Sequence, residues 1–133
     1  MNKEQENDAD QISDDDLLYR RFHPASLRHD GRIAGIAYML PKKTIPDPEI
    51  SVDLASKTTP ERTLQAAPPI FGLAVLKVEA VRELGFTVRR ASSKGNPAHC
   101  IIEGAKSKID CSRLAEITQV YIYPPGKTNV FRS

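Results

Sequence analysis

Short apolar runs, separated by prolines, glycines and polar clusters, divide the chain into short segments. Residues 50–54 alternate apolar and polar side chains, which is typical of a half-buried strand. Apolar runs bounded by turn residues predict further strands in the same way. These further strands cover residues 17–22, 70–78, 86–90, 98–103 and 120–123. Residues 33–40 are apolar throughout, and their Gly35 with the following Pro41 favours a strand or irregular chain over a stable helix.

Capping residues and periodicity predict three short helices. The Thr-Pro-Glu triplet at residues 59–61 suits a helix start, and the proline pair at residues 68–69 ends that helix. Residues 79–84 predict a second helix, ended by a glycine in the left-handed conformation. Residues 108–117 predict an amphipathic helix with three core contacts. Those contacts are expected from Ile109, Leu114 and Ile117.

The order of these elements predicts an α+β fold. Few connections are long enough for a parallel crossover, so we expect a mixed, mainly antiparallel sheet with two or three short helices. The predicted organisation has three parts: a disordered acidic tail at residues 1–13, a single α+β domain at 14–124 and a C-terminal tail at 125–133.

Charge is distributed unevenly along the 133 residues. The first 16 residues carry seven acidic side chains and one basic one, whereas the remainder carries 18 basic and 10 acidic side chains. The acidic tail is expected to be a solvated leader, and the alternative is that it folds back on the basic domain and screens it from other anions. The lysines form no stripe and aromatic residues make up only 6% of the chain, which disfavours nucleic-acid binding.

The sequence also bears on location. It has neither the features of a signal peptide nor an apolar run long enough to span a membrane. Cys100 and Cys111 lack the spacing of a metal site, so we expect two reduced thiols in a cytoplasmic protein, with a disulfide between them as the alternative.

Two adjacent arginines, Arg20 and Arg21, lie inside the first predicted strand. Neighbours on a strand point to opposite faces, so we expect the two arginines to be separated by the sheet and at least one to be partly buried. A buried guanidinium needs a partner. The predicted partner is Asp53, which shares a strand face with Ser51. Two alternatives stay open: an arginine and Ser51 line a pocket for phosphate or carboxylate, or both arginines extend to solvent.

His99 is a polar residue in an otherwise apolar predicted strand, where a structural role is more frequent than a catalytic one. The chain has no H-x-x-x-H pair, no glycine-rich phosphate loop and no G-x-S-x-G turn. We therefore predict no metal and no cofactor, and the sequence assigns no catalytic residue.

Four segments together resemble a family of small bacterial proteins of unknown activity. The segments are DDDLLYRRFHP, ISVDLAS, GLAVLKVEAVRELGFTV and NPAHCIIEG, which lie within residues 14–117. The resemblance directs attention to the Leu-Tyr-Arg-Arg, Ser-Val-Asp and Asn-Pro-Ala-His motifs. The positions that it selects are Tyr19, Arg20, Arg21, Ser51, Asp53, Asn96 and His99.

A weaker likeness is to the layout of NAD-using ADP-ribosyltransferases. In that layout an early arginine holds the dinucleotide phosphates and a later serine braces the pocket, roles that Arg20 or Arg21 and Ser51 would match. The late catalytic glutamate has no clear match, because Glu103 is the only candidate on a strand and Glu116 lies on a predicted helix.

These observations predict a small cytoplasmic single-domain protein that acts as a non-catalytic interaction module with another protein. The alternative is a nucleotide- or NAD-binding domain related to ADP-ribosyltransferases, with a small anion or nucleotide bound between an arginine, Ser51 and His99. The residues predicted to bind a ligand are Tyr19, Arg20, Arg21, Ser51, Asp53 and His99.

Overall fold

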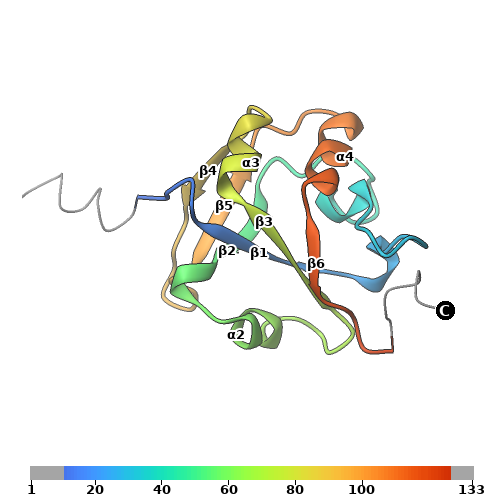
Figure 1. Cartoon of the computed structure of the whole chain (residues 1–133), viewed down its shortest axis with the longest axis horizontal. Helices are drawn as coiled ribbons and strands as arrows, with labels where there is room; N and C mark the ends of the chain where they lie inside the picture. Colours follow the sequence, from blue (N-terminus) through green and yellow to red (C-terminus); the bar gives the residue numbers. More distant parts are fainter. Residues whose placement is uncertain (1–10, 127–133) are drawn as a thin grey trace, which may run out of the picture.

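The computed structural model describes residues 11–126, which contain six strands and three α-helices. The strands are β1 Leu17–Phe22, β2 Ile50–Leu54, β3 Gly72–Lys77, β4 Thr87–Arg90, β5 His99–Glu103 and β6 Gln119–Ile122. They form one sheet in the order β4-β5-β2-β1-β3-β6, and each neighbouring pair is antiparallel (Figure 1). The predicted α+β class with a mainly antiparallel sheet is confirmed.

The three α-helices are short, and two of them begin at a capping hydroxyl, of which Thr59 was predicted from the sequence. They are α2 Pro60–Gln65, α3 Val78–Glu83 and α4 Lys108–Glu116. The Thr59 hydroxyl accepts a hydrogen bond of 3.1 Å from the main-chain nitrogen of Arg62 at the start of α2. The Ser107 hydroxyl accepts an equivalent 3.1 Å bond from the nitrogen of Asp110 at the start of α4. Each cap satisfies a main-chain donor that the first helical turn leaves unpaired.

The apolar segment at residues 33–40 is an irregular connection that contains a 3₁₀ helix, η2 (Gly35–Tyr38). Two further 3₁₀ turns are η1 (Pro24–Ser26) and η3 (Ala55–Lys57). Gly35 permits a close approach of η2 to α4, because a Cβ atom on it would lie 3.1 Å from the main-chain nitrogen of Ser112. Contact with α4, which is distant in the sequence, therefore accommodates this apolar segment, and its pairing is limited to isolated bridges at Ile33 and Met39.

One face of the sheet carries the hydrophobic core. Inward-facing side chains of β1, β2, β3 and β5 pack there against η2, α3 and α4, and Figure 1 shows α3 and α4 on one side of the strands and α2 on the other. The largest fully buried side chains include Tyr38, Phe22, Leu18, Ile50, Leu76, Ile102 and Leu114. Burying these apolar side chains supplies most of the driving force for folding.

The inward face of α4 differs from the predicted one. Ile109, a predicted core contact, is 71% exposed, whereas Leu114 is fully buried and Ile117 is half-buried. Cys111 and Ala115 occupy the remaining inward positions. Ile109 lies two residues before Cys111, which corresponds to a rotation of about 200° around the helix axis. The prediction for Ile109 was wrong because it overlooked Cys111 as a small apolar core residue.

The opposite, outer face of the sheet is only partly covered. Helix α2 packs on it at one place, where its Thr63 contacts side chains of β1 and β2. The outer face is open at Leu17 on β1 and at Tyr121 on β6, whose side chains are 40% and 59% exposed. An antiparallel sheet tolerates such one-sided coverage, because only one of its faces has to be buried.

The predicted acidic tail lies mostly outside the described residues. Within the described part, Ile12 is 7% exposed and belongs to the core, and its main-chain oxygen accepts a hydrogen bond of 2.8 Å from Arg82. Arg82 also pairs with Asp14. Ile12 and Ser13, which were predicted to belong to the tail, therefore have contacts with the folded domain or its first turn. Of the predicted C-terminal tail, residues 127–133 lie outside the description as well.

No helix among residues 11–126 combines the length and the hydrophobicity that crossing a membrane requires.

Candidate functional site

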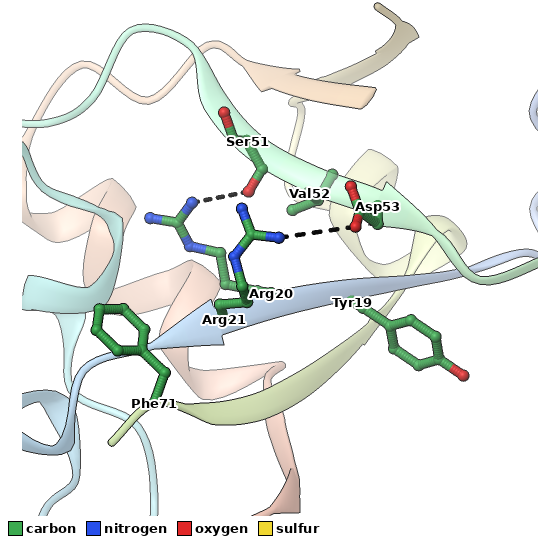
Figure 2. Close-up of a pocket in the computed structure, with 7 residues that line it drawn as sticks. All are labelled: Tyr19, Arg20, Arg21, Ser51, Val52, Asp53 and Phe71. Atoms are coloured by element: carbon green, nitrogen blue, oxygen red, sulfur yellow. Dashed lines mark hydrogen bonds and ion pairs between the residues drawn. The ribbon is translucent and has the colours of Figure 1, made fainter. Parts of the chain in front are cut away.

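Strands β1 and β2 pair over only two positions and then separate. Leu18 lies opposite Leu54 and Tyr19 lies opposite Asp53, after which β1 continues beside β3 alone. The Arg20 guanidinium takes over at the point of separation and donates a hydrogen bond of 2.7 Å to the main-chain oxygen of Ser51 (Figure 2). It thus links the two strands where their ladder of main-chain hydrogen bonds has ended.

Arg20 also connects the sheet to the 3₁₀ helix η2. Its second terminal nitrogen donates a 2.6 Å hydrogen bond to the main-chain oxygen of Ala37, and its guanidinium carbon lies 5.4 Å from the centre of the Tyr38 ring. Burial lowers the pKa of Arg20, and the charges of Tyr38 and Asp47 act in the opposite direction. Arginine remains charged in proteins, so this is a buried cation held by carbonyl dipoles and an aromatic face.

The carboxylate of Asp53 lies at the centre of a second polar cluster. Asp53 is 4% exposed, and its two oxygens accept hydrogen bonds of 2.9 Å from the Thr63 hydroxyl and from the Asn96 side-chain amide. Arg21 lies 3.8 Å from the same carboxylate and donates a 3.1 Å hydrogen bond to the main-chain oxygen of Thr63. The predicted ion pair is therefore present, and it is made by Arg21. It fastens α2 to the outer face of the sheet.

Ser51 and His99 form a third polar contact on the outer face. Nε2 of His99 lies 3.2 Å from the Ser51 hydroxyl, and Nδ1 lies 3.0 Å from the main-chain oxygen of Ala91. A carbonyl oxygen only accepts, so neutral His99 carries its proton on Nδ1 and Nε2 accepts from the serine. Both ring nitrogens thus have partners, which fixes the orientation of the ring across β2 and β5.

The two arginines converge on one small cavity, which we call the arginine pocket. It has a volume of about 190 Å³ and is shown in Figure 2. Its lining residues are Tyr19, Arg20, Arg21, Ser51, Val52, Asp53 and Phe71. Five of the six residues predicted to bind a ligand line this cavity, and His99 does not, although it contacts Ser51.

The separation of the two arginines by the sheet was predicted wrongly. Both guanidinium groups line the arginine pocket, because β1 and β2 diverge beyond Tyr19 and leave a gap between the strands. The Arg20 side chain starts on the core face and extends into this gap, where it reaches the main-chain oxygen of Ser51. Strand periodicity fixes the face of the sheet on which a side chain starts. Where the main-chain pairing of two strands has ended, a long side chain also reaches the space between the strands.

Sequence reasoning missed the partner of Tyr19. The rings of Tyr19 and Tyr121 are stacked, with centroids 6.3 Å apart and planes 16° from parallel. A β-bulge lies between Leu73 and Ala74 in the pairing of β3 with β6, so the register around Tyr121 departs from simple alternation. We call the exposed surface formed by Leu17, Tyr19 and Tyr121 the tyrosine face. The sequence signal that points to it is a tyrosine within the strand predicted at residues 120–123.

The glutamates considered for the ADP-ribosyltransferase layout lie away from the arginine pocket. Glu103 forms an ion pair of 3.0 Å with Arg89 on β4, and Glu116 lies at the end of α4. Neither residue lines the arginine pocket. Among residues 11–126, no group of three or more histidine, cysteine, aspartate or glutamate side chains is arranged to hold a metal ion.

Comparisons of the chain with protein-family models, with curated proteins and with solved structures found no match. The resemblance to a family of small bacterial proteins therefore stays a prediction.

Proposed function

We propose that this protein is a non-catalytic interaction module that binds another protein through the tyrosine face. The observation that carries the proposal is the stacked pair of Tyr19 and Tyr121 on a part of the sheet that α2 leaves open. Exposed apolar surface on a small domain commonly marks a binding site for another protein. Tyrosine is enriched in such interfaces because it offers a large rigid surface and a polar end.

The polar residues near this surface support a structural role better than a catalytic one. Arg20 is bound to two main-chain carbonyls, and Arg21 is bound to Thr63 and Asp53. The arginine pocket, at about 190 Å³, is also smaller than the roughly 300–1,000 Å³ typical of small-molecule sites. These features disfavour the alternative of a nucleotide- or NAD-binding domain.

The chemistry of the tyrosine face indicates what the partner offers. Burial, Tyr121 and Glu61 raise the pKa of Tyr19 further above neutral pH, so its phenol is protonated and offers a hydrogen-bond donor to a partner. Leu17 adds an aliphatic side chain that is 40% exposed. A matching partner surface is apolar and carries a hydrogen-bond acceptor near its centre. We further propose a cytoplasmic location, which the two free cysteines, Cys100 and Cys111, support.

The test uses a photo-crosslinking amino acid at position 121 and, as a matched control, at position 109. Ile109 is 71% exposed on α4, away from the tyrosine face. We expect one protein to be crosslinked in living cells from position 121 and not from position 109. With that protein purified, Tyr121→Ser should weaken binding about tenfold or more, whereas Ile109→Ser should leave the Kd unchanged. An unchanged Kd for Tyr121→Ser would contradict the proposal.

A further inference from the structure

A second cavity, which we call the apolar groove, lies beyond the end of β1. It is formed by the end of β1, the turns η1 and η2, and the loop that follows η2, and its volume is about 360 Å³. Its apolar wall comprises Ile36, Met39, Leu40, Pro41 and Phe71. Ile36 is 48% exposed, so an apolar side chain on this wall stays in contact with solvent.

The charges in the apolar groove are mainly positive. Arg20 and Arg21 line it as well as the arginine pocket, and Lys42 lines it from the loop side. Asp47 is the acidic residue in its lining, and Arg21 is also paired with Asp53, which leaves the cations in excess by one. The cavity therefore combines an apolar wall with an excess of cationic groups, which complements a ligand that has an apolar body and a single negative charge.

We propose that the apolar groove binds a small apolar monocarboxylate. The hydrocarbon part packs against Ile36 and Phe71, and the carboxylate is directed toward the guanidinium groups of Arg20 and Arg21. A guanidinium presents five N–H donors, and the bonds to Ser51, Ala37 and Thr63 leave further donors on both arginines. The side chain of Arg21 is 30% exposed, which leaves part of it accessible to a ligand.

The walls of the groove are held in place before any ligand binds. Arg20 fixes η2 to β1 through its hydrogen bond to Ala37. The loop is closed by a 2.8 Å hydrogen bond from the nitrogen of Leu40 to the oxygen of Ile45. Lys42 and Thr44 have φ angles of 73° and 51°, a left-handed conformation that is unfavourable for residues other than glycine. Such conformations are held where surrounding structure requires them, often at binding sites.

The charge and the size of the groove both bear on the class of ligand. A ligand with several phosphates would place some of its negative charges against the apolar wall. Burying those charges without hydrogen-bond or ion-pair partners is unfavourable. An alkyl ammonium would meet the cationic excess of Arg20, Arg21 and Lys42. A monocarboxylate satisfies both conditions. None of the three residues of the tyrosine face lines this groove, so the proposal goes beyond the proposed interaction with a protein.

The test is titration of the full-length protein with octanoate, octan-1-ol and octylammonium, followed by amide chemical shifts and calorimetry. We expect octanoate to shift the amides of Ile36, Met39 and Phe71 and to bind about tenfold more tightly than octan-1-ol. Within a series of alkyl carboxylates, affinity should rise about fourfold for each methylene until the groove is filled. Equal affinities for octanoate and octan-1-ol would overturn the recognition of the carboxylate.

Matched variants locate the site. Ile36→Glu should weaken octanoate binding about tenfold or more, because it removes apolar contact and adds a repelling charge, whereas Ile109→Glu should not. Lys42→Gln should weaken it about two- to fivefold, and Lys43→Gln, at the neighbouring position, should leave it unchanged.

Three results would overturn the proposal. The first is no shift at millimolar octanoate, the second is a shift confined to the tyrosine face, and the third is unchanged binding by Ile36→Glu. A short peptide with one glutamate between leucines is the remaining comparison. If it shifts the same amides and binds more tightly than octanoate, the ligand class is an acidic peptide and not a small carboxylate. Each of these results leaves the crosslinking test at position 121 unaffected, so failure of one proposal is distinguishable from failure of the other.

Discussion

The guanidinium of Arg20 donates a 2.7 Å hydrogen bond to the main-chain oxygen of Ser51, where strands β1 and β2 stop pairing. A side chain thereby replaces a main-chain link between the two central strands. The same guanidinium binds Ala37 of η2, so one residue joins two strands and the segment that packs on α4. Arg20 is thus a structural connection as well as a wall of two cavities.

We predict that Arg20→Ala destabilises the fold by about 3 kcal/mol, because two charge-assisted hydrogen bonds are lost and two carbonyls lose their donor. Arg20→Lys should recover only part of this, since an ammonium cannot reach both carbonyls in the geometry of a fork. Urea unfolding measures both. The control is Arg28→Ala. The Arg28 side chain is 52% exposed, so this substitution should change the free energy of unfolding by less than about 0.5 kcal/mol. Equal stabilities for all variants would refute the role of Arg20.

The buried carboxylate of Asp53 gives a second prediction. Asp53→Ala leaves the donors of Thr63, Asn96 and Arg21 without their acceptor and should cost about 3–5 kcal/mol of stability. Thr63→Val removes one hydrogen bond and should cost about 1 kcal/mol. In a double-mutant cycle, the effects of Asp53→Ala and Thr63→Val should be non-additive by about 1 kcal/mol, because the two residues share one bond. Strict additivity in chemical unfolding would show that the bond contributes nothing.

Tyr38 gives a prediction about alkaline pH. Burial raises the pKa of Tyr38 to about 12, against the lowering effects of Thr118 and Arg20. The Thr118 hydroxyl donates to the main-chain oxygen of Leu114, so neutral Tyr38 donates the 2.7 Å bond to Thr118, and Thr118 stabilises the phenolate only by turning its hydroxyl away from Leu114.

The unfolded chain releases the Tyr38 proton near its ordinary pKa of about 10. Below that pH, Tyr38 is protonated in both states and its contribution to the free energy of unfolding does not depend on pH. It should fall between pH 10 and pH 12, by up to about 1.4 kcal/mol per pH unit. Urea unfolding from pH 9 to 12 measures this, and Tyr38→Phe is the reference because it cannot ionise. The prediction fails if both proteins lose stability with the same pH dependence.

Gly72 and Gly95 provide a matched pair of glycines. A Cβ on Gly72 would lie 2.6 Å from the Phe22 ring and 2.8 Å from the main-chain oxygen of Ile122, whereas a Cβ on Gly95 would have no neighbour within 4 Å. Gly72→Ala should therefore destabilise the fold by about 1–3 kcal/mol. Gly95→Ala should be neutral or stabilising by up to about 1 kcal/mol. Thermal unfolding of the two variants compares them, and similar melting temperatures would count against the close approach at Gly72.

The sequence allowed the elements to be predicted where the signal is local. The Thr-Pro-Glu triplet at residues 59–61 caps α2, and Gly85 adopts a left-handed φ of 96° directly after α3. The strands at residues 17–22 and 50–54 were predicted with the bounds that the structure shows. The prediction of residues 33–40 was less specific, because their conformation depends on contact with α4 rather than on their own apolar pattern.

The amino-acid sequence by itself determined which residues carry polar groups in apolar strands, and so it identified Arg20, Arg21, Ser51, Asp53 and His99. Only the tertiary structure decided how they are used. Asp53 binds Arg21 and Thr63, Ser51 binds His99, and Arg20 binds the main-chain oxygen of Ser51 in the gap between β1 and β2. Periodicity fixes the face on which a side chain begins, because it depends on the local backbone alone. The place where two strands separate depends on residues far apart in the chain, and no local pattern encodes it.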